Sequence, residues 1–147
     1  MIQIRRSAIV PQTAEQMFDL VNDVNAYPRR FDWCADARVL ASDEASITAR
    51  LDLRLGGLTQ GFTTRNTLER PALDRPGRIT LALVEGPFRA LSGVWTFMRL
   101  GDAGCKIALS LDFDYSGLMA PLLRSGFQKL ADRMVDEFCS EAGRVYV

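Results

Sequence analysis

The sequence predicts an α+β fold in which a curved antiparallel sheet of about six to seven strands surrounds a long C-terminal helix, with two short helices after the first strand. Two observations predict it. Between residues 118 and 144, apolar side chains recur every three or four positions, which is typical of one amphipathic helix. Between residues 47 and 115, they recur every second position in runs separated by turns rich in glycine or proline, which is typical of strands with one dry face.

The N-terminal part of the chain predicts one strand and two short helices. The strand covers residues 3–10 and ends at a proline. Thr13 and Gln16 then have the capping-box spacing that opens a helix. Proline disfavours helical geometry in the residue before it, so Tyr27–Pro28 is expected to begin a new segment, a second short helix running to Trp33.

The middle of the chain predicts the rest of the sheet. An edge strand and five further strands cover residues 39–43, 47–55, 59–68, 79–83, 91–97 and 105–115. Gly56–Gly57 joins two of them as a hairpin. Strands joined by short turns are antiparallel neighbours, and each of these has a single apolar face. The twisted sheet is therefore expected to curl around the terminal helix.

The terminal helix is expected to begin close to Ala120, because Pro121 fits a first helical turn and would break a helix interior. Its apolar stripe consists of Met119, Leu122, Leu123, Phe127, Leu130, Met134, Phe138 and Ala142. Each of these side chains stabilises the fold by about 1.5–3 kcal/mol when buried, so core packing alone is a sufficient reason for the pattern. The stripe equally suits the wall of a pocket under a curved sheet.

Length and composition predict a single domain over residues 1–147. Lys plus Arg equals Asp plus Glu at 18 each, so no overall charge favours nucleic acid, and DNA is not an expected partner. No apolar run reaches the ~20 residues of a membrane span, and we expect a cytoplasmic protein. Three cysteines scattered over different elements suit free thiols better than a disulfide framework.

The chain contains no histidine. This excludes Ser-His-Asp and Cys-His catalysis and His-ligated metal sites. Asp112 and Asp114 lie in the outward phase of the last strand, which favours solvated surface over paired catalytic carboxylates. The sequence therefore gives no convincing catalytic constellation and predicts neither a metal nor an obligatory cofactor.

Three segments carry a family resemblance: LVNDVNAYP at residues 20–28, FTTRN at 62–66 and VEGPFRALSGVWTF at 84–97. They resemble the coenzyme Q-binding and RatA-type branch of the START-like, polyketide cyclase/dehydrase superfamily, which has the helix-grip fold. The resemblance covers nearly the whole chain. The chain departs from the family pattern after Tyr27–Pro28, where Arg30 replaces an aromatic residue and Asp32 replaces a proline.

The resemblance implies a hydrophobic cavity between the sheet and the terminal helix that binds a lipid-like molecule. A polyprenyl quinone is the first candidate ligand, with a role in respiratory quinone function and peripheral contact with the inner membrane. The alternative that it implies is a RatA-type toxin that binds the large ribosomal subunit and inhibits translation initiation. A polyketide cyclase or dehydratase-like enzyme is the third. Short arginine clusters, Arg5–Arg6 and Arg29–Arg30 with Arg38, are a weak signal for ribosomal RNA.

The candidate ligand-binding residues are largely apolar. They are Phe31, Trp33, Phe62, Asn66, Leu83, Phe88, Trp95, Met119, Leu122, Leu123 and Phe127. Phe31 and Trp33 are expected at an exposed mouth. The N-terminal half of the terminal helix, residues 119–127, is expected to form the cavity wall, and residues 130–138 to be plain core. Asn66 either bonds to neighbouring backbone or orients a polar ligand head.

Overall fold

The computed structural model describes residues 1–147 and contains one sheet and four helical segments. The strands are β1 (Ile2–Val10), β2 (Cys34–Ser42), β3 (Ser46–Leu55), β4 (Leu58–Glu69), β5 (Gly77–Glu85), β6 (Phe88–Arg99) and β7 (Cys105–Tyr115). The helical segments are α1 (Ala14–Asn22), the 3₁₀ turn η1 (Val24–Ala26), α2 (Tyr27–Arg30) and α3 (Pro121–Val145).

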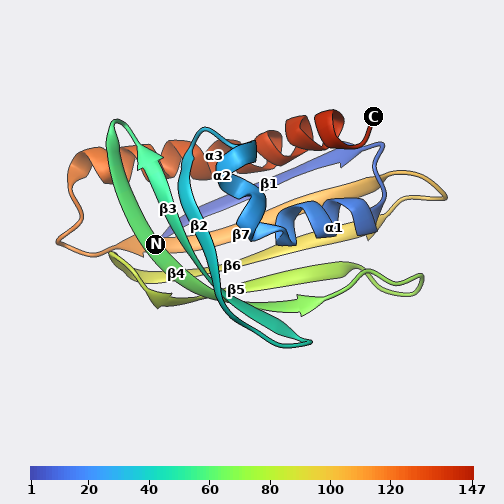
Figure 1. Ribbon diagram of the computed structural model, residues 1–147, viewed down its shortest axis with the longest axis horizontal. Coiled ribbons are helices and arrows are strands. Elements are labelled where there is room, and N and C mark those ends of the chain that lie inside the picture. The colour runs from blue at the N-terminus through green and yellow to red at the C-terminus, as the bar shows by residue number, and fades with distance from the viewer.

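The sheet is a meander in which β1 returns to pair with β7. Its seven strands run in the order β1-β7-β6-β5-β4-β3-β2, and all neighbouring strands that pair are antiparallel. The sheet curves, and α3 lies along its concave face (Figure 1). The predicted fold class is confirmed. The edge strand β2 begins at Cys34, five residues earlier than the predicted 39–43, and so extends the sheet beside α2.

The β3–β4 hairpin closes through the two predicted glycines. Leu55 pairs with Leu58, so the loop is Gly56–Gly57 alone, and both glycines have positive φ angles of 62° and 87°. A two-residue hairpin loop with two positive φ angles matches the twist of the flanking strands. Register shifts in β2, between β4 and β5, and between β6 and β7 bend the sheet further.

The N-terminal helices cover one end of the concave face. The Thr13 hydroxyl accepts from the Gln16 backbone N–H, and the Gln16 side chain accepts from the Thr13 backbone N–H, which confirms the capping box. The expectation that Tyr27 leaves helical geometry is wrong. Tyr27 has φ −54° and ψ −43°, and α2 ends at Arg30 rather than Trp33. The missing N–H of Pro28 costs nothing here, because it lies in a first turn, where that N–H has no partner in the helix.

Helix α3 begins as predicted, with Ala120 as its N-cap and Pro121 in its first turn. Arg124 holds the segment that leads from β7 into α3, since its guanidinium donates to the backbone carbonyls of Ser116 and Met119. Gly126 lets the helix approach β3 closely, because a Cβ at this position would lie 2.9 Å from the Cβ of Leu55. The helix is thus held against the β3–β4 end of the sheet.

All three cysteines are free thiols, as predicted. Burial raises the pKa of the Cys34 and Cys105 thiols to about 11. None of the helices combines the length and apolar character that crossing a membrane requires.

Candidate functional site

An apolar cavity of about 100 Å³ lies between the concave face of the sheet and α3. Of the 22 residues that line it, 19 are hydrophobic. They come from three sources. The α1–α2 segment and Trp33 provide Val21, Asn22, Val24, Tyr27 and Trp33; the sheet provides Ala49, Leu51, Leu53, Phe62, Thr64, Asn66, Ile79, Leu81, Leu91, Trp95, Leu109 and Leu111; α3 provides Phe127, Leu130, Ala131, Met134 and Phe138. The cavity lies where the sequence predicts it, between the sheet and the terminal helix.

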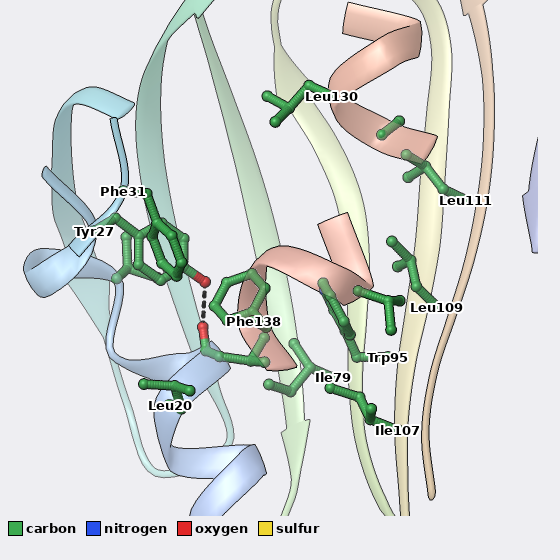
Figure 2. Packing of buried hydrophobic residues seen from close by; sticks show 14 of the residues in the cluster. Leu20, Tyr27, Phe31, Ile79, Trp95, Ile107, Leu109, Leu111, Leu130 and Phe138 are labelled. Atoms are coloured by element: carbon green, nitrogen blue, oxygen red, sulfur yellow. Dashed lines mark hydrogen bonds between the residues drawn. The ribbon is translucent and has the colours of Figure 1, made fainter. Parts of the chain in front are cut away.

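One end of the cavity is an aromatic cluster centred on Phe138 of α3. Its ring lies 5.5 Å from the Tyr27 ring and 5.3 Å from the Trp95 ring, measured between centroids, in edge-to-face arrangements. Phe31 packs on it at 4.8 Å and stacks on Trp33 at 4.7 Å. Figure 2 shows how side chains from α2, α3 and the sheet converge here. The cluster joins three separate parts of the chain and fixes the shape of this end of the cavity.

Tyr27 is the lining residue with an ionisable side chain, and its hydroxyl is already engaged. It donates to the backbone carbonyl of Val21 (Figure 2). Burial away from solvent raises the pKa of the Tyr27 hydroxyl, so it stays neutral at physiological pH. The lining supplies no group that exchanges a proton near neutral pH. The chemistry that these residues can perform is binding and orientation.

The other polar groups of the cavity are two amides, one hydroxyl and the indole N–H groups of Trp33 and Trp95. The Thr64 hydroxyl donates to Asn66 Oδ1 over 2.7 Å. Asn22 Oδ1 and Trp33 Nε1 are buried and have no hydrogen-bond partner. Buried polar groups are normally paired, so these two atoms are unusual features of the cavity lining.

The structure brings five of the eleven predicted ligand-binding residues to the cavity: Trp33, Phe62, Asn66, Trp95 and Phe127. The other six, Phe31, Leu83, Phe88, Met119, Leu122 and Leu123, lie outside its lining. Phe88 instead packs between Phe62 and Phe127, with ring centroids 5.7 Å and 4.8 Å away. Leu83 and Leu123 are partly buried against the core.

The predicted wall of the cavity on the terminal helix is wrong in its position. Leu122 is 52% exposed and faces the β3–β4 turn, next to Gly56. Met119 is buried but precedes the helix. The wall is formed instead by the segment from Phe127 to Phe138, most of which was expected to be plain core. The physical reason is the close approach at Gly126, which leaves no space between the first turns of α3 and β3.

The predicted exposed mouth at Phe31 and Trp33 is also wrong. These side chains are 5% and 4% exposed, because α2 folds them inward onto Phe138. Sequence reasoning missed the contributions of Asn22 and Ala131. A small residue within the apolar stripe of a long helix is the signal that could have indicated Ala131.

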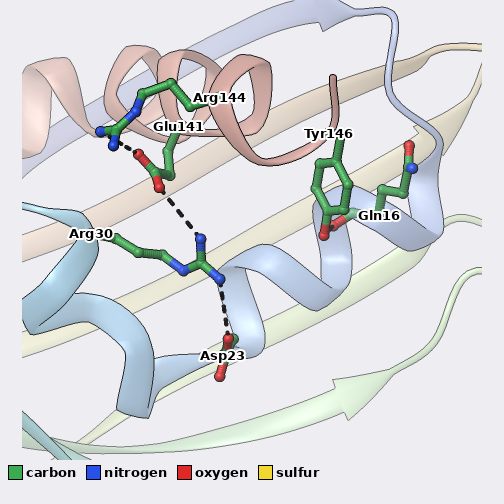
Figure 3. A network of polar contacts seen from close by, with 6 residues as sticks. All are labelled: Gln16, Asp23, Arg30, Glu141, Arg144 and Tyr146. Carbon is green, nitrogen blue, oxygen red and sulfur yellow. Dashed lines mark hydrogen bonds and ion pairs between the residues drawn. The ribbon is translucent and has the colours of Figure 1, made fainter.

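A network of charged side chains joins α2 to the C-terminal part of α3 (Figure 3). Arg30 of α2 contacts Glu141 of α3 at 3.3 Å and Asp23 at 3.6 Å, and Arg144 contacts Glu141 at 3.2 Å. Glu141 is buried, so this pair holds α2 against the C-terminal part of α3. Arg30, which departs from the family pattern, therefore serves a contact within the fold.

The other charged residues singled out from the sequence lie at the surface. Asp112 pairs with Arg5 at 2.8 Å and Asp114 with Arg89 at 3.5 Å on the face of the sheet away from α3, which confirms their outward orientation. Arg6 pairs with an aspartate of α3, and Arg38 with a neighbouring aspartate in β2. These carboxylates reduce the basic character of the predicted arginine clusters.

A family model described as "Polyketide cyclase / dehydrase and lipid transport" matches residues 10–139, which include every strand after the first and most of α3. The chain belongs to this polyketide cyclase/dehydrase family. The family assignment agrees with the resemblance in the sequence and with the sheet-and-helix architecture. The ZhuI aromatase/cyclase from Streptomyces sp. R1128 has a TM-score of 0.83 and 19% identity, over 99% of this chain and 96% of that one, which shows the shared fold.

Two curated proteins are similar over nearly the whole chain. The ribosome association toxin RatA of Pseudomonas aeruginosa is 45% identical over 145 residues, covering 97% of this chain and 96% of that protein. The mitochondrial coenzyme Q-binding protein COQ10 homolog B of Xenopus laevis is 25% identical over 154 residues, covering 99% of this chain and 59% of that protein. Relatives with two different named roles are thus similar in sequence to this chain.

Proposed function

We propose that the chain binds a hydrophobic, lipid-like ligand in the cavity between the sheet and α3. The observation that carries this proposal is an apolar space of about 100 Å³ that the packed core leaves open. Protein interiors are normally filled to the density of organic crystals, and an unfilled volume costs stability. A cavity retained despite that cost suits the accommodation of a guest.

The size of the cavity limits what it holds without rearrangement. Its volume of about 100 Å³ is close to the ~150 Å³ of an engineered apolar cavity that binds benzene. It is below the roughly 300–1,000 Å³ of pockets for drug-sized ligands. A ring-sized head group therefore fits this state, and a longer tail requires α2 or α3 to move outward. A polyprenyl quinone, with a ring head and an apolar tail, remains the first candidate ligand.

In this proposal the protein has a role in respiratory quinone function. It works in the cytoplasm, with peripheral contact at the inner membrane where such a ligand is exchanged. The quinone-binding name of the Xenopus relative supports the ligand class, and the fold supports the location of the ligand.

Ligand extraction tests the proposal directly. The protein is purified from its native host under mild conditions, and bound molecules are extracted and identified by mass spectrometry. A variant with a filled cavity, Ala131→Leu, is purified in parallel as the matched control. The expected result is an apolar, ring-containing molecule that is enriched with the native chain and depleted with the variant. Equal amounts in both samples contradict binding in this cavity.

A second function is favoured by sequence similarity rather than by the cavity. The relative with 45% identity over 97% of the chain is named as a ribosome association toxin. We propose on this ground that the chain also associates with the ribosome, at the large subunit, and inhibits translation initiation. The two proposals are compatible, since one concerns the interior and the other the surface.

Ribosome profiles on sucrose gradients test this second function. Overproduction of the chain is expected to raise the free-subunit peaks and lower the 70S peak, with the protein sedimenting alongside the large subunit. The Ala131→Leu variant separates the two proposals, because it changes the interior and leaves the surface as it is. Unchanged subunit joining together with absence of the protein from the subunit fractions contradicts ribosome association.

A further inference from the structure

Three polar side chains of the cavity hold hydrogen-bonding groups that the rest of the protein leaves unused. Trp33 is 4% exposed, and its indole Nε1–H has no acceptor. The buried Oδ1 of Asn22 has no donor. Asn66 Oδ1 accepts from Thr64, which leaves the Asn66 amide N–H groups available. The cavity therefore offers both unpaired donors and an unpaired acceptor.

Two of these groups belong to residues that lie near Tyr27. The Tyr27 hydroxyl donates to the carbonyl of Val21, which directly precedes Asn22. The Tyr27 ring also packs edge-on against Trp33, with centroids 5.9 Å apart. An unpaired acceptor, Asn22 Oδ1, and an unpaired donor, Trp33 Nε1, thus belong to lining residues that neighbour Tyr27, and Trp33 also packs on Phe138.

The lining has no charged side chain, and Tyr27 stays neutral. A carboxylate or phosphate in this space would lack a cationic partner, and burial of an unpaired charge is strongly unfavourable. An uncharged molecule avoids this cost. A carbonyl or ether oxygen accepts from Trp33 but leaves Asn22 Oδ1 without a donor. A hydroxyl group can both donate and accept a hydrogen bond. It can therefore pair with the Asn22 amide whether the oxygen or the NH₂ group of that amide faces the bound molecule.

We infer that the cavity selects an uncharged aromatic ring that carries a hydroxyl group, of the phenol or quinol class, with the hydroxyl held by Asn22 and Trp33. A second oxygen on the ring is held by the free Asn66 amide. The inference rests on the proposed ligand-binding function and adds head-group specificity to it. For a ligand with two oxidation states, the reduced quinol binds more tightly than the oxidised quinone, whose oxygens only accept.

Calorimetric titration with three ring-sized probes tests the inference: 4-ethylphenol, its methyl ether 4-ethylanisole, and the anion 4-ethylbenzoate. The phenol is expected to bind about tenfold more tightly than the ether, because an unpaired buried polar group costs enough for such a ratio. The benzoate is expected to show no binding. Asn22→Leu is expected to lower the phenol-to-ether ratio towards one and to leave the affinity for the ether nearly unchanged. Trp33→Phe is expected to weaken the binding of phenol and ether alike, because both oxygens accept from the indole N–H.

Asn25→Asp serves as the matched control. Asn25 is exposed and outside the cavity lining, and its Oδ1 accepts from the Val39 backbone N–H, a contact that aspartate retains. The control is expected to keep the native ratio. Phenol and ether binding with equal affinity overturns the head-group inference but leaves ligand binding intact. Absence of binding by all three probes overturns the inference together with the proposed function. A ratio that persists in Asn22→Leu overturns the role of Asn22, and phenol and ether affinities that are both unchanged in Trp33→Phe overturn the role of Trp33.

Discussion

Filling the cavity from α3 should stabilise the protein. Ala131 lines the cavity and is only 2% exposed, so Ala131→Leu directs three additional carbon atoms into the void. A void costs about 24 cal/mol per Å³, so a cavity of about 100 Å³ represents about 2.4 kcal/mol. Partial filling by one leucine should recover about 1–2 kcal/mol of the free energy of unfolding, equivalent to a rise in Tm of about 3–6 °C.

The sign of this change is the informative quantity. In a core without a void, the same substitution overpacks the interior and costs about 1–3 kcal/mol. Ala142→Leu provides that comparison, because Ala142 lies on the same helix, is fully buried and does not line the cavity. Urea unfolding followed by circular dichroism gives both free energies. Destabilisation of the Ala131→Leu and Ala142→Leu variants alike would refute the presence of a usable void.

Three further predictions concern the scaffold around the cavity. Glu141→Leu leaves the largely buried Arg30 guanidinium with Asp23 as its remaining carboxylate partner, so it should cost up to about 3 kcal/mol in urea unfolding. Adding Arg30→Met in the same chain should recover most of that loss, and additive losses would contradict the contact. Burial raises the pKa of the Cys34 and Cys105 thiols from 9.0 to about 11. The stabilisation that this shift contributes to the folded state is complete below pH 9 and is lost as the pH rises towards 11. The free energy of unfolding, measured across this range, should therefore fall less in the double alanine variant than in the native chain. Gly126→Ala should lower the Tm, because its Cβ would lie 2.9 Å from a carbon of β3, although alanine favours helices by about 1 kcal/mol relative to glycine. Gly143→Ala on the same helix should raise the Tm, because a Cβ at that position contacts no other atom.

The fold could be predicted from local patterns because each element has its own signal in the sequence. Alternating apolar residues defined the strands, Gly56–Gly57 fixed one hairpin, and Pro121 fixed the start of α3. These signals act over a few residues, where backbone preference and one buried face decide the structure. The start of β2 was placed too late because its first residues carry no clear alternation.

The position of the cavity along α3 depends on contacts between distant residues and could not be predicted in the same way. The apolar stripe of the helix is continuous, and the sequence does not show where the sheet touches it. Gly126 meets Leu55 closely, which fills the N-terminal end, while Ala131 leaves space further along. Likewise, Phe31 and Trp33 are buried by a helix remote in sequence, so their local surroundings suggested exposure.

The central claim, that the interior binds an apolar guest, is tested most directly by tryptophan fluorescence. Trp33 and Trp95, the only two tryptophans in the chain, both line the cavity, so a quinone bound there quenches both indoles. Titration with a short-chain ubiquinone should give saturable quenching at one molecule per chain, and Ala131→Leu should abolish it. Linear, unsaturable quenching, or the same saturation curve in both proteins, would contradict the claim.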